Sequence, residues 1–256
     1  MPKRRGKTRP VALVTGAGVR LGRAIASALA GDGADVVLHY LTSEQEAAAL
    51  ARQLRARGAK AWLLRADLAD PAQAEALVDE AVAACGRPCA ILVNSASIFP
   101  AGRLGDVTAD DLALNMQVNA YAPLALACAF ARQFPRPARG PLPCVVNLLD
   151  SRITDYDAEH AAYHVSKRAL HTLTKMMALE FAPRVRVNAV APGLILPPAG
   201  QTVAYLRKLA HTNPMNRFGS PADIAEAVRF LLRSGFLTGQ VIYVDGGRHL
   251  RGNLYG

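Results

Sequence analysis

The sequence predicts an α/β fold in which a parallel sheet is covered by helices on both faces. Short β-branched runs alternate with longer segments of helical periodicity, and the runs are almost wholly apolar, as strands buried on both sides are. The runs lie at 11–14, 35–39, 61–64, 90–93, 144–148, 185–190 and 240–244. Polar and glycine residues follow most of them, which predicts a ligand cleft at the carboxyl edge of the sheet.

The helical segments show one apolar face and recognisable end signals. In the first segment the apolar positions are Leu21, Ile25, Ala28 and Leu29, and glycines follow at 31 and 33. Ser43 with Glu46 predicts a capping box for the second helix, and Asp70 before Pro71 predicts the start of the third. Longer helical patterns run through 109–133, 157–181 and 222–233, and a short one through 205–210. The segments 135–143 and 197–214 are otherwise irregular.

Composition indicates one globular domain. The chain has 256 residues, of which 51% are hydrophobic and 20% charged, with a net charge of +10. We predict a basic disordered extension over 1–9 and a single domain over 10–256, with a substrate loop at about 194–215. No apolar run approaches the roughly 20 residues of a membrane span. The four cysteines lack metal spacing, so we expect no metal site, reduced thiols and a cytoplasmic location.

A glycine-rich turn follows the first strand and opens a helix. Gly16 and Gly22 permit a tight turn and close backbone approach to a pyrophosphate, whose charge suits a helix N-terminus. Arg20 and Leu21 lie inside the same turn. The pattern favours a dinucleotide site, although a plain strand–helix turn has similar composition.

Tyr163 and Lys167 are spaced i, i+4 in a helical segment and therefore share one face. An ammonium beside a phenol favours the phenolate, so this spacing predicts a lowered tyrosine pKa and a proton donor near neutral pH. Such pairs are common on helices, but here other polar residues are expected near the pair. Asp150 follows the fifth strand, Asn94 ends the fourth, and Asn119 lies in the next helix.

Together these residues resemble the short-chain dehydrogenase/reductase family from position 11 to position 247. The resemblance rests on Thr15-Gly16…Gly22, Asp67-Leu68, Asn94-Ser95-Ala96, Asn119, Tyr163…Lys167, Arg186-Val187-Asn188…Pro192-Gly193 and Val244-Asp245-Gly246-Gly247. It implies a single-domain Rossmann-like, doubly wound sheet of about seven strands and a nicotinamide cofactor. It also implies an enzyme, because the catalytic positions are intact.

The resemblance assigns roles to particular residues. Tyr163 is the expected proton donor, Lys167 binds the nicotinamide ribose and tunes the tyrosine, and Asn119 holds a water in a proton relay. Contacts with the cofactor are expected from Gly16, Arg20, Leu21, Gly22, Asp67, Leu68, Asn94, Ser95, Ala96, Tyr163, Lys167, Pro192, Gly193 and Leu194. Family members are usually homotetramers, which we expect here, and residues 248–256 could close a neighbour's active site.

Three departures from the family pattern resemble the pteridine reductases, including the bacterial dihydromonapterin/dihydrofolate reductase branch. Arg20 and Asp150 stand where glycine and serine are usual, and Ser97 with Phe99 follows the fourth strand. The resemblance implies that Arg20, Ser97, Phe99, Asp150, Tyr163 and Leu194 contact a pterin. Alternatives remain for three of these positions: a register slip would bring Ser151 into the serine role, Phe99 could belong to the core, and Arg20 could serve only as a phosphate clamp.

Chemistry favours the pterin. A carboxylate at Asp150 would repel the alkoxide that forms on a reduced ketone, whereas a pterin presents ring N–H and amino donors that a carboxylate accepts. The ring also needs a proton on nitrogen after hydride transfer, and Phe99 would offer a flat face for stacking.

The end of the second strand predicts the cofactor. NAD-specific members carry an acid there to bind the ribose 2′-hydroxyl, whereas this chain has no acid before Glu44. The residues present are His39, Tyr40, Leu41, Thr42 and Ser43. Hydroxyls and an imidazole would tolerate a 2′-phosphate, so NADPH is expected. Ser43 is also the predicted helix cap, which leaves the use of its hydroxyl open.

The sequence therefore predicts an NADPH-dependent pteridine reductase acting on a dihydropterin or dihydrofolate. The first alternative is a carbonyl reductase of the same family, acting on a ketoacyl thioester or a quinone. The second is a non-catalytic NADP-binding sensor or scaffold, against which the intact Asn119, Tyr163 and Lys167 argue. No membrane or nucleic-acid partner is expected, although the basic N-terminus leaves a salt-dependent nucleic-acid contact to be tested.

Overall fold

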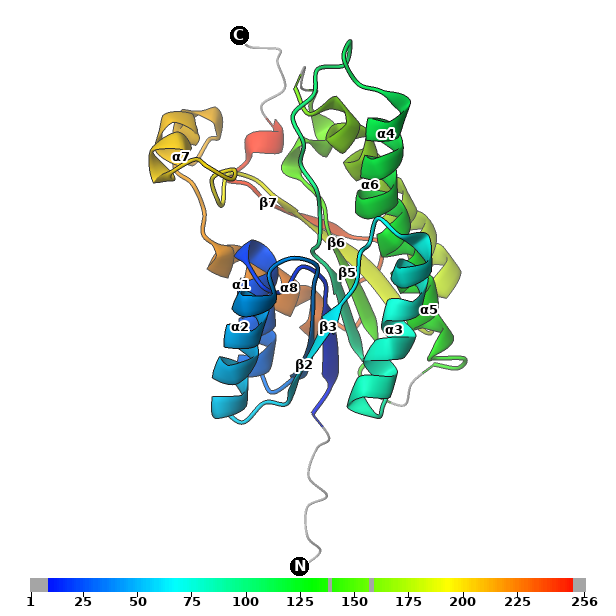
Figure 1. Cartoon of the computed structure of the whole chain (residues 1–256). Coiled ribbons are helices and arrows are strands. Elements are labelled where there is room, and N and C mark those ends of the chain that lie inside the picture. The colour runs from blue at the N-terminus through cyan, green and yellow to red at the C-terminus, as the bar shows by residue number, and fades with distance from the viewer. Residues whose placement is uncertain (1–8, 138–139, 157–158, 251–256) are drawn as a thin grey trace, which may run out of the picture.

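The computed structural model describes residues 9–137, 140–156 and 159–250. Within these ranges all the strands pair in parallel, in a seven-stranded sheet of order β3-β2-β1-β4-β5-β6-β7 (Figure 1). The strands are β1 (Val11–Val14), β2 (Asp35–Tyr40), β3 (Ala61–Arg65), β4 (Ile91–Asn94), β5 (Cys144–Leu148), β6 (Arg186–Pro192) and β7 (Val241–Val244). The order reverses between β1 and β4, so the predicted doubly wound fold is confirmed and its switch point lies beside the glycine-rich turn.

Helices cover both faces of this sheet (Figure 1). One face carries α1 (Arg20–Gly31), α2 (Glu44–Ala56) and α8 (Pro221–Arg233), and the other carries α3 (Pro71–Cys85), α5 (Ala122–Arg132) and α6 (Ala161–Phe181). The remaining helices are α4 (Ala109–Met116) and α7 (Val203–Leu209), with the short turns η1 (Gln117–Tyr121), η2 (Ser151–Thr154), η3 (Ala210–Thr212) and η4 (Arg248–Leu250). Because both faces are covered, the sheet's free carboxyl edge is the place left for a site.

The strands begin and end within two residues of the predicted runs, but the long helix predicted over 109–133 is divided. Between α4 and α5 lies one π-helical stretch, η1, which contains Asn119. The helix predicted from 157 begins at Ala161, and residues 157 and 158 lie outside the described ranges. Residues 138 and 139 of the predicted loop also lie outside them.

Two predicted helix caps have different outcomes. The Asp70 carboxylate accepts hydrogen bonds from the backbone N–H groups of Ala72 and Gln73, so the predicted cap of α3 is confirmed. Ser43 occupies the N-cap position of α2, but its side chain makes no capping bond, so the predicted capping box is wrong. The Ser43 hydroxyl is thereby not committed to the helix.

Two arginines make contacts at the first residues of strands β2 and β6. Arg9 lies at the end of the predicted extension, and its guanidinium lies 3.0 Å from the Asp35 carboxylate; residues 1–8 are outside the described ranges. Arg186 on β6 is only 5% exposed. Its guanidinium donates to the last carbonyls of α8 and the turn after it, on Leu231, Leu232, Ser234 and Leu237. This contact fixes α8 against the sheet.

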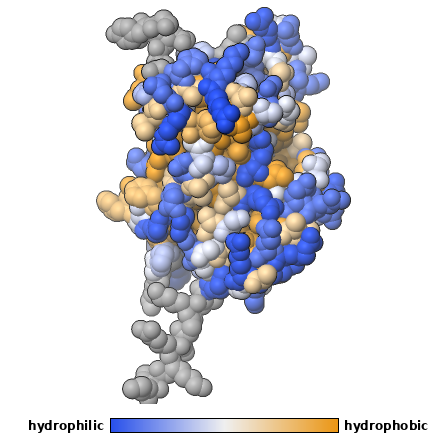
Figure 2. All heavy atoms as spheres, turned by 90° about the vertical axis from the view of Figure 1, so that its left-hand side faces the viewer, coloured by the Kyte–Doolittle hydropathy of each residue, from blue (hydrophilic) through white to orange (hydrophobic). Residues whose placement is uncertain are grey.

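The surface on the side of α1, α2 and α7 is largely hydrophilic, with hydrophobic side chains exposed between the polar ones (Figure 2). Among the described residues, no helix has both the length and the apolar character needed to cross a membrane.

Candidate active site

The glycine-rich turn after β1 packs directly against the end of β4. Gly16 has a φ of +62°, and a Cβ there would lie 3.0 Å from the Cα of Ala96. A Cβ on Gly22 would lie 2.2 Å from the Gly16 carbonyl oxygen, so both positions require glycine. The Thr15 hydroxyl accepts hydrogen bonds from the backbone N–H groups of Ser95 and Ala96. The turn and the β4 end therefore form one unit at the switch point.

His39 supports this turn from within. The Gly16 N–H donates to Nδ1 at 3.2 Å, and Nε2 lies 3.1 Å from the Ala66 carbonyl oxygen, to which it donates. The ring is 2% exposed, and burial lowers the pKa of His39. The structure thus differs from the expectation that His39 faces a phosphate, because a buried neutral imidazole with both nitrogens engaged has no bond left for a ligand.

The N-terminus of α1 fits an anion. Its N-cap residue, Val19, supplies no side-chain bond, and no acidic residue lies in the first turn. The first N–H groups and the positive end of the helix dipole are therefore available to a pyrophosphate. Arg20 has a φ of +52°, in the left-handed region that costs a non-glycine residue about 1 kcal/mol or more. Its guanidinium donates to the Pro197 carbonyl at 2.9 Å, which ties the turn to the substrate loop.

The loop after β2 presents hydroxyls and a cation. Leu41 and Thr42 are exposed, and the Ser43 side chain does not cap α2. The Arg65 guanidinium, at the end of β3, donates through Nε to the Leu41 carbonyl at 3.2 Å. Sequence reasoning missed Arg65, because its position follows only from the β2–β3 register, which pairs it with Tyr40.

Other residues expected at the cofactor lie at neighbouring strand ends. Tyr40 and Leu68 are buried, and the Leu68 carbonyl accepts a hydrogen bond from the Gln117 side chain. Asp67 is half-buried and accepts from the Ala69 N–H. Asn94 is buried and donates to the Asn147 side chain at 2.8 Å. These side chains hold the edge of the sheet together beside the switch point.

Asn119 is buried at the centre of a network linking three segments. Its carboxamide oxygen accepts bonds from the Ser97 hydroxyl and the Ile98 N–H, each at 2.9 Å. Its amide nitrogen donates to the Ile98 carbonyl and to the Ser166 hydroxyl. The side chain expected to hold a water is thus occupied by protein partners, and it fixes the segment that carries Ser97 against α6.

The side chains of Asp150 and Tyr163 meet just beyond the C-terminal end of β5. Asp150 precedes η2, and its Oδ1 accepts from the Arg152 N–H at 2.8 Å, which fixes the carboxylate. The Tyr163 hydroxyl donates to Asp150 Oδ2 at 3.0 Å. The neighbouring Ser151 lies in η2, and its buried hydroxyl has no hydrogen-bond partner among the described residues. The Tyr163 hydroxyl contacts Asp150 instead, so the alternative of a register slip is not supported.

Burial and the Asp150 carboxylate raise the pKa of Tyr163 well above its ordinary value. This differs from the expectation that Lys167 lowers it. The Lys167 ammonium lies 5.7 Å from the centre of the Tyr163 ring and donates to the Leu148 carbonyl at 2.8 Å. Burial lowers the pKa of Lys167 to about 8. The phenol consequently keeps its proton at neutral pH, with the proton directed at a fixed carboxylate.

The lowered pKa of Lys167 predicts that the stability of the fold depends on pH. Between pH 8 and 10.5 the unfolded chain binds the Lys167 proton and the folded chain does not, so this group adds stability as pH rises. The free energy of unfolding of the wild type, relative to Lys167→Met, should increase by about 3 kcal/mol across that window. Urea unfolding of both proteins at several pH values measures it, and parallel pH profiles would contradict the assignment.

Phe99 is at the lip of the site rather than in the core. It is 45% exposed, and its ring packs edge-on against Tyr163 with centroids 4.6 Å apart. The His160 ring stacks on it at 3.8 Å, and its Nδ1 lies 2.8 Å from the Pro100 carbonyl oxygen. His160 was missed in the sequence, because nothing in its neighbourhood along the chain indicates that it meets Phe99.

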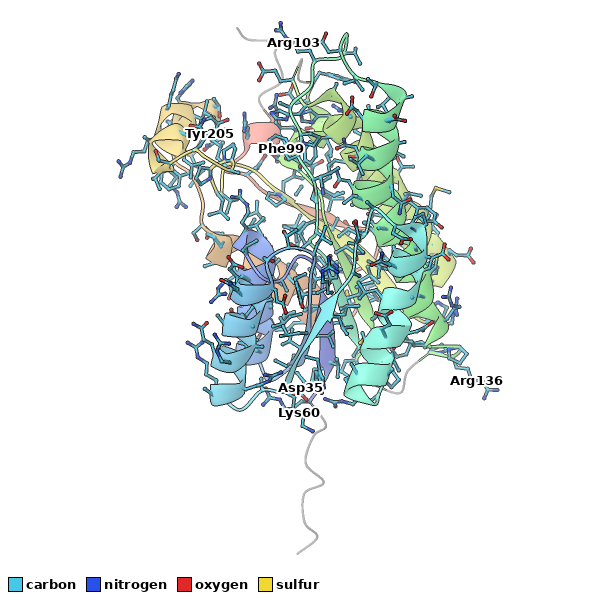
Figure 3. All side chains as sticks on the ribbon, in the orientation of Figure 1. Asp35, Lys60, Phe99, Arg103, Arg136 and Tyr205 are labelled. Carbon is cyan, nitrogen blue, oxygen red and sulfur yellow. The ribbon has the colours of Figure 1, made fainter. Side chains whose placement is uncertain are left out.

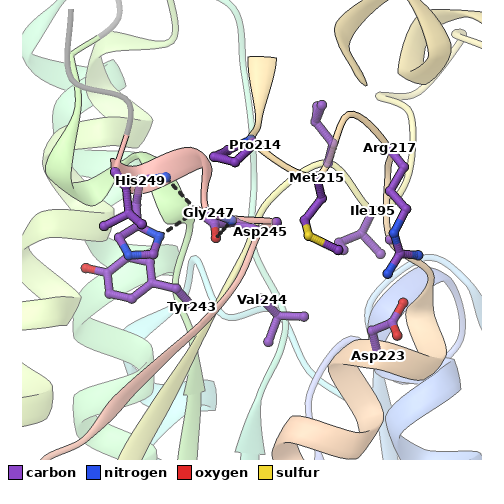
Figure 4. Close-up of a pocket in the computed structure, with 14 residues that line it drawn as sticks. Ile195, Pro214, Met215, Arg217, Asp223, Tyr243, Val244, Asp245, Gly247 and His249 are labelled. Atoms are coloured by element: carbon purple, nitrogen blue, oxygen red, sulfur yellow. Dashed lines mark hydrogen bonds and ion pairs between the residues drawn. The ribbon is translucent and has the colours of Figure 1, made fainter. Parts of the chain in front are cut away.

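The residues that follow β6 border the candidate site on the side away from Phe99. The Gly193 N–H donates to Val244 on β7, and the Leu194 carbonyl accepts from Gly219. Beyond Leu194 lies a cavity of about 540 Å³ between the substrate loop and the segment after β7 (Figure 4). Neither Tyr163 nor Asp150 lines this cavity. In Figure 3 Phe99 and Tyr205 of α7 lie at the same upper end of the molecule, across the open edge of the sheet.

Known proteins resemble this chain over nearly its whole length. A family model described as enoyl-(acyl carrier protein) reductase matches residues 16–249. Galactitol 2-dehydrogenase of Rhizobium johnstonii is 37% identical, over 92% of this chain and 93% of its own. Pteridine reductase 1 of Leishmania tarentolae is 34% identical, over 95% and 97%. The crystal structure of FolM alternative dihydrofolate reductase 1 from Brucella canis, complexed with NADP, superposes with a TM-score of 0.86 at 31% identity, over 94% and 95%.

Proposed function

This chain belongs to the short-chain dehydrogenase/reductase family, and on that premise we propose that it is an NADPH-dependent pteridine reductase. Its substrate is a dihydropterin or dihydrofolate, which it reduces to the tetrahydro form. Support comes from the relatives whose names include pteridine reductase and dihydrofolate reductase. Further support comes from the residues around Tyr163, where the chain departs from the common family pattern.

The hydrogen bond from the Tyr163 hydroxyl to Asp150 Oδ2 carries the proposal. A carboxylate beside the proton donor disfavours a developing alkoxide and suits a ring that presents N–H donors. The raised pKa of Tyr163 keeps its hydroxyl protonated, so it can protonate a ring nitrogen. The buried Lys167 ammonium stands behind the ring and stabilises the phenolate that remains.

The chain's own residues fit NADPH. The glycine turn and the uncapped N-terminus of α1 suit the pyrophosphate, and Thr42, Ser43 and Arg65 suit the 2′-phosphate. When bound, NADPH supplies the hydride that reduces a C=N bond of the pterin ring, at C6 of a 7,8-dihydropterin. Arg65 adds a cation beside these hydroxyls.

The exposed Phe99 ring suits the pterin as a stacking surface, since aromatic rings pack well in offset or edge-to-face arrangements. Ser97 is held by Asn119 at the same lip, so its backbone and hydroxyl stand at a fixed position for the substrate. Arg20 reaches across to the Pro197 carbonyl, in the segment predicted to cover the substrate.

A panel of substrates tests the proposal. NADPH consumption is followed by absorbance with dihydrobiopterin, dihydromonapterin, dihydrofolate and a ketoacyl thioester side by side. Turnover of a dihydropterin or dihydrofolate without turnover of the thioester is expected. Turnover of the thioester alone would overturn the proposal and leave the family assignment standing.

Galactitol 2-dehydrogenase, a similar relative named for an alcohol substrate, makes carbonyl reduction the second candidate. Asp150→Ser separates the two. Because the serine hydroxyl is neutral, it donates to an alkoxide and no longer accepts from a pterin, so pterin turnover should fall at least tenfold while ketone reduction rises. Both rates are measured on one preparation. An unchanged ratio of pterin to ketone turnover would show that Asp150 does not set the substrate class.

A further inference from the structure

Arg248 stands beside the site on η4, which packs against η2, the turn that Asp150 precedes. Its side chain is half-buried. Across the described ranges of the chain, no residue forms a hydrogen bond or an ion pair with its guanidinium. A half-buried cation without a close partner is costly, so the position calls for an explanation.

The charged groups around Arg248 are of both signs. Burial, and after it the guanidinium of Arg152, lower the pKa of Arg248. The carboxylates of Asp150 and Asp155 and the phenol of Tyr205 act in the opposite direction. Asp150 and Asp155 flank η2, and Tyr205 lies on α7, so the groups that act on Arg248 come from these two parts of the fold.

The anion that fits here belongs to the substrate. The negative groups of the cofactor have their own places, at the N-terminus of α1 and at the end of β2. Arg248 instead lies on η4, which packs against η2, and Asp150 at the start of η2 accepts the hydrogen bond of the Tyr163 hydroxyl. A group bound by Arg248 therefore belongs to the molecule that Tyr163 protonates.

We propose that Arg248 binds a carboxylate on the side chain of the pterin substrate, so that the enzyme prefers dihydropterins with an anionic tail, such as dihydrofolate, over those with a neutral one. A planar guanidinium pairs with a carboxylate through two parallel hydrogen bonds, which gives both affinity and orientation. This inference rests on the proposed pteridine reductase function and specifies its substrate class.

The test compares two substrates with the same ring, dihydrofolate and dihydrobiopterin, on the full chain with NADPH. The measured quantity is the ratio of kcat/KM for dihydrofolate to kcat/KM for dihydrobiopterin. Arg248→Gln removes the charge at similar length and should lower this ratio by about tenfold or more, through the KM for dihydrofolate. Arg233→Gln removes the same charge from an exposed position at the end of α8 and should leave the ratio unchanged.

Two further measurements keep the inference testable if Arg248→Gln folds poorly. In the wild type the ratio should fall as ionic strength rises, because salt screens the guanidinium–carboxylate attraction. Arg248→Lys, which keeps the charge and loses the paired geometry, should give an intermediate ratio.

The measurements distinguish a failure of the proposed function from a failure of the proposed role of Arg248. A wild type that reduces neither substrate would overturn the proposed function, and the inference with it. A wild type that reduces both, with a ratio insensitive to Arg248→Gln, Arg248→Lys and salt, would overturn the inference alone. Equal changes for Arg248→Gln and Arg233→Gln would also overturn it, since they would report net charge rather than a local contact.

Discussion

Replacing Tyr163 by phenylalanine should lower kcat by about a hundredfold to ten-thousandfold, the usual contribution of a positioned general acid. The substitution removes the hydroxyl that donates to Asp150 and keeps the ring that packs against Phe99. Because the glycine turn and the end of β2 are untouched, the Kd for NADPH should change by less than about twofold. Steady-state kinetics and cofactor fluorescence titration measure the two quantities.

Two controls sharpen this expectation. Tyr121→Phe removes a hydroxyl that bonds Glu75 on the surface, and it should leave turnover unchanged. Normal activity in Tyr163→Phe would refute the assignment of the proton donor. A loss of NADPH affinity as large as the loss of turnover would instead indicate that Tyr163 holds the cofactor rather than the transferable proton.

Replacing Arg186 by methionine should lower the free energy of unfolding by about 3 kcal/mol or more. The guanidinium is buried and donates to four backbone carbonyls, two at the end of α8 and two in the turn after it. Methionine fills similar space but donates nothing, so those carbonyls lose their partners while α8 stays in contact with the sheet. Urea unfolding measures the loss.

Arg184→Met is the matched control for Arg186→Met. Arg184 precedes β6 and makes one long bond, 3.4 Å, to the Phe134 carbonyl. Its replacement should cost less than about 1 kcal/mol. If the two variants lost equal stability, the effect would belong to a general change in charge, and the anchoring role of Arg186 would fall.

The fold could be predicted from the sequence because strands buried on both faces appear in it as short, almost wholly apolar runs. The runs at 11–14 and 144–148 coincide with β1 and β5, and the others differ only at their ends. The π-helical stretch η1 did not follow, since its residues have the same helical pattern as their neighbours. The absence of a side-chain cap at Ser43 could not be predicted either, because a serine at a helix N-cap can bond the helix backbone or leave its hydroxyl free for another partner.

The site followed only in part, because motifs report positions along the chain rather than environments. The resemblance to pteridine reductases implied that Asp150 and Tyr163 serve the same substrate, but not that burial and the carboxylate would outweigh the effect of the lysine on the tyrosine pKa. His39 ends a predicted strand, where ligand-binding residues are expected, yet its partners are the residue after β3 and the glycine turn. Arg65 and Arg248 became visible only through strand register and packing.

The clamp formed by His39 has a consequence for how coenzyme preference evolves. The glycine turn is held by buried groups, whereas Leu41 and Thr42, which we propose meet the adenosine end of the coenzyme, are exposed. Substitutions at exposed loop positions usually change stability by less than about 0.5 kcal/mol. A lineage can therefore exchange one nicotinamide coenzyme for the other by altering this loop, without loosening the scaffold that orients the reaction.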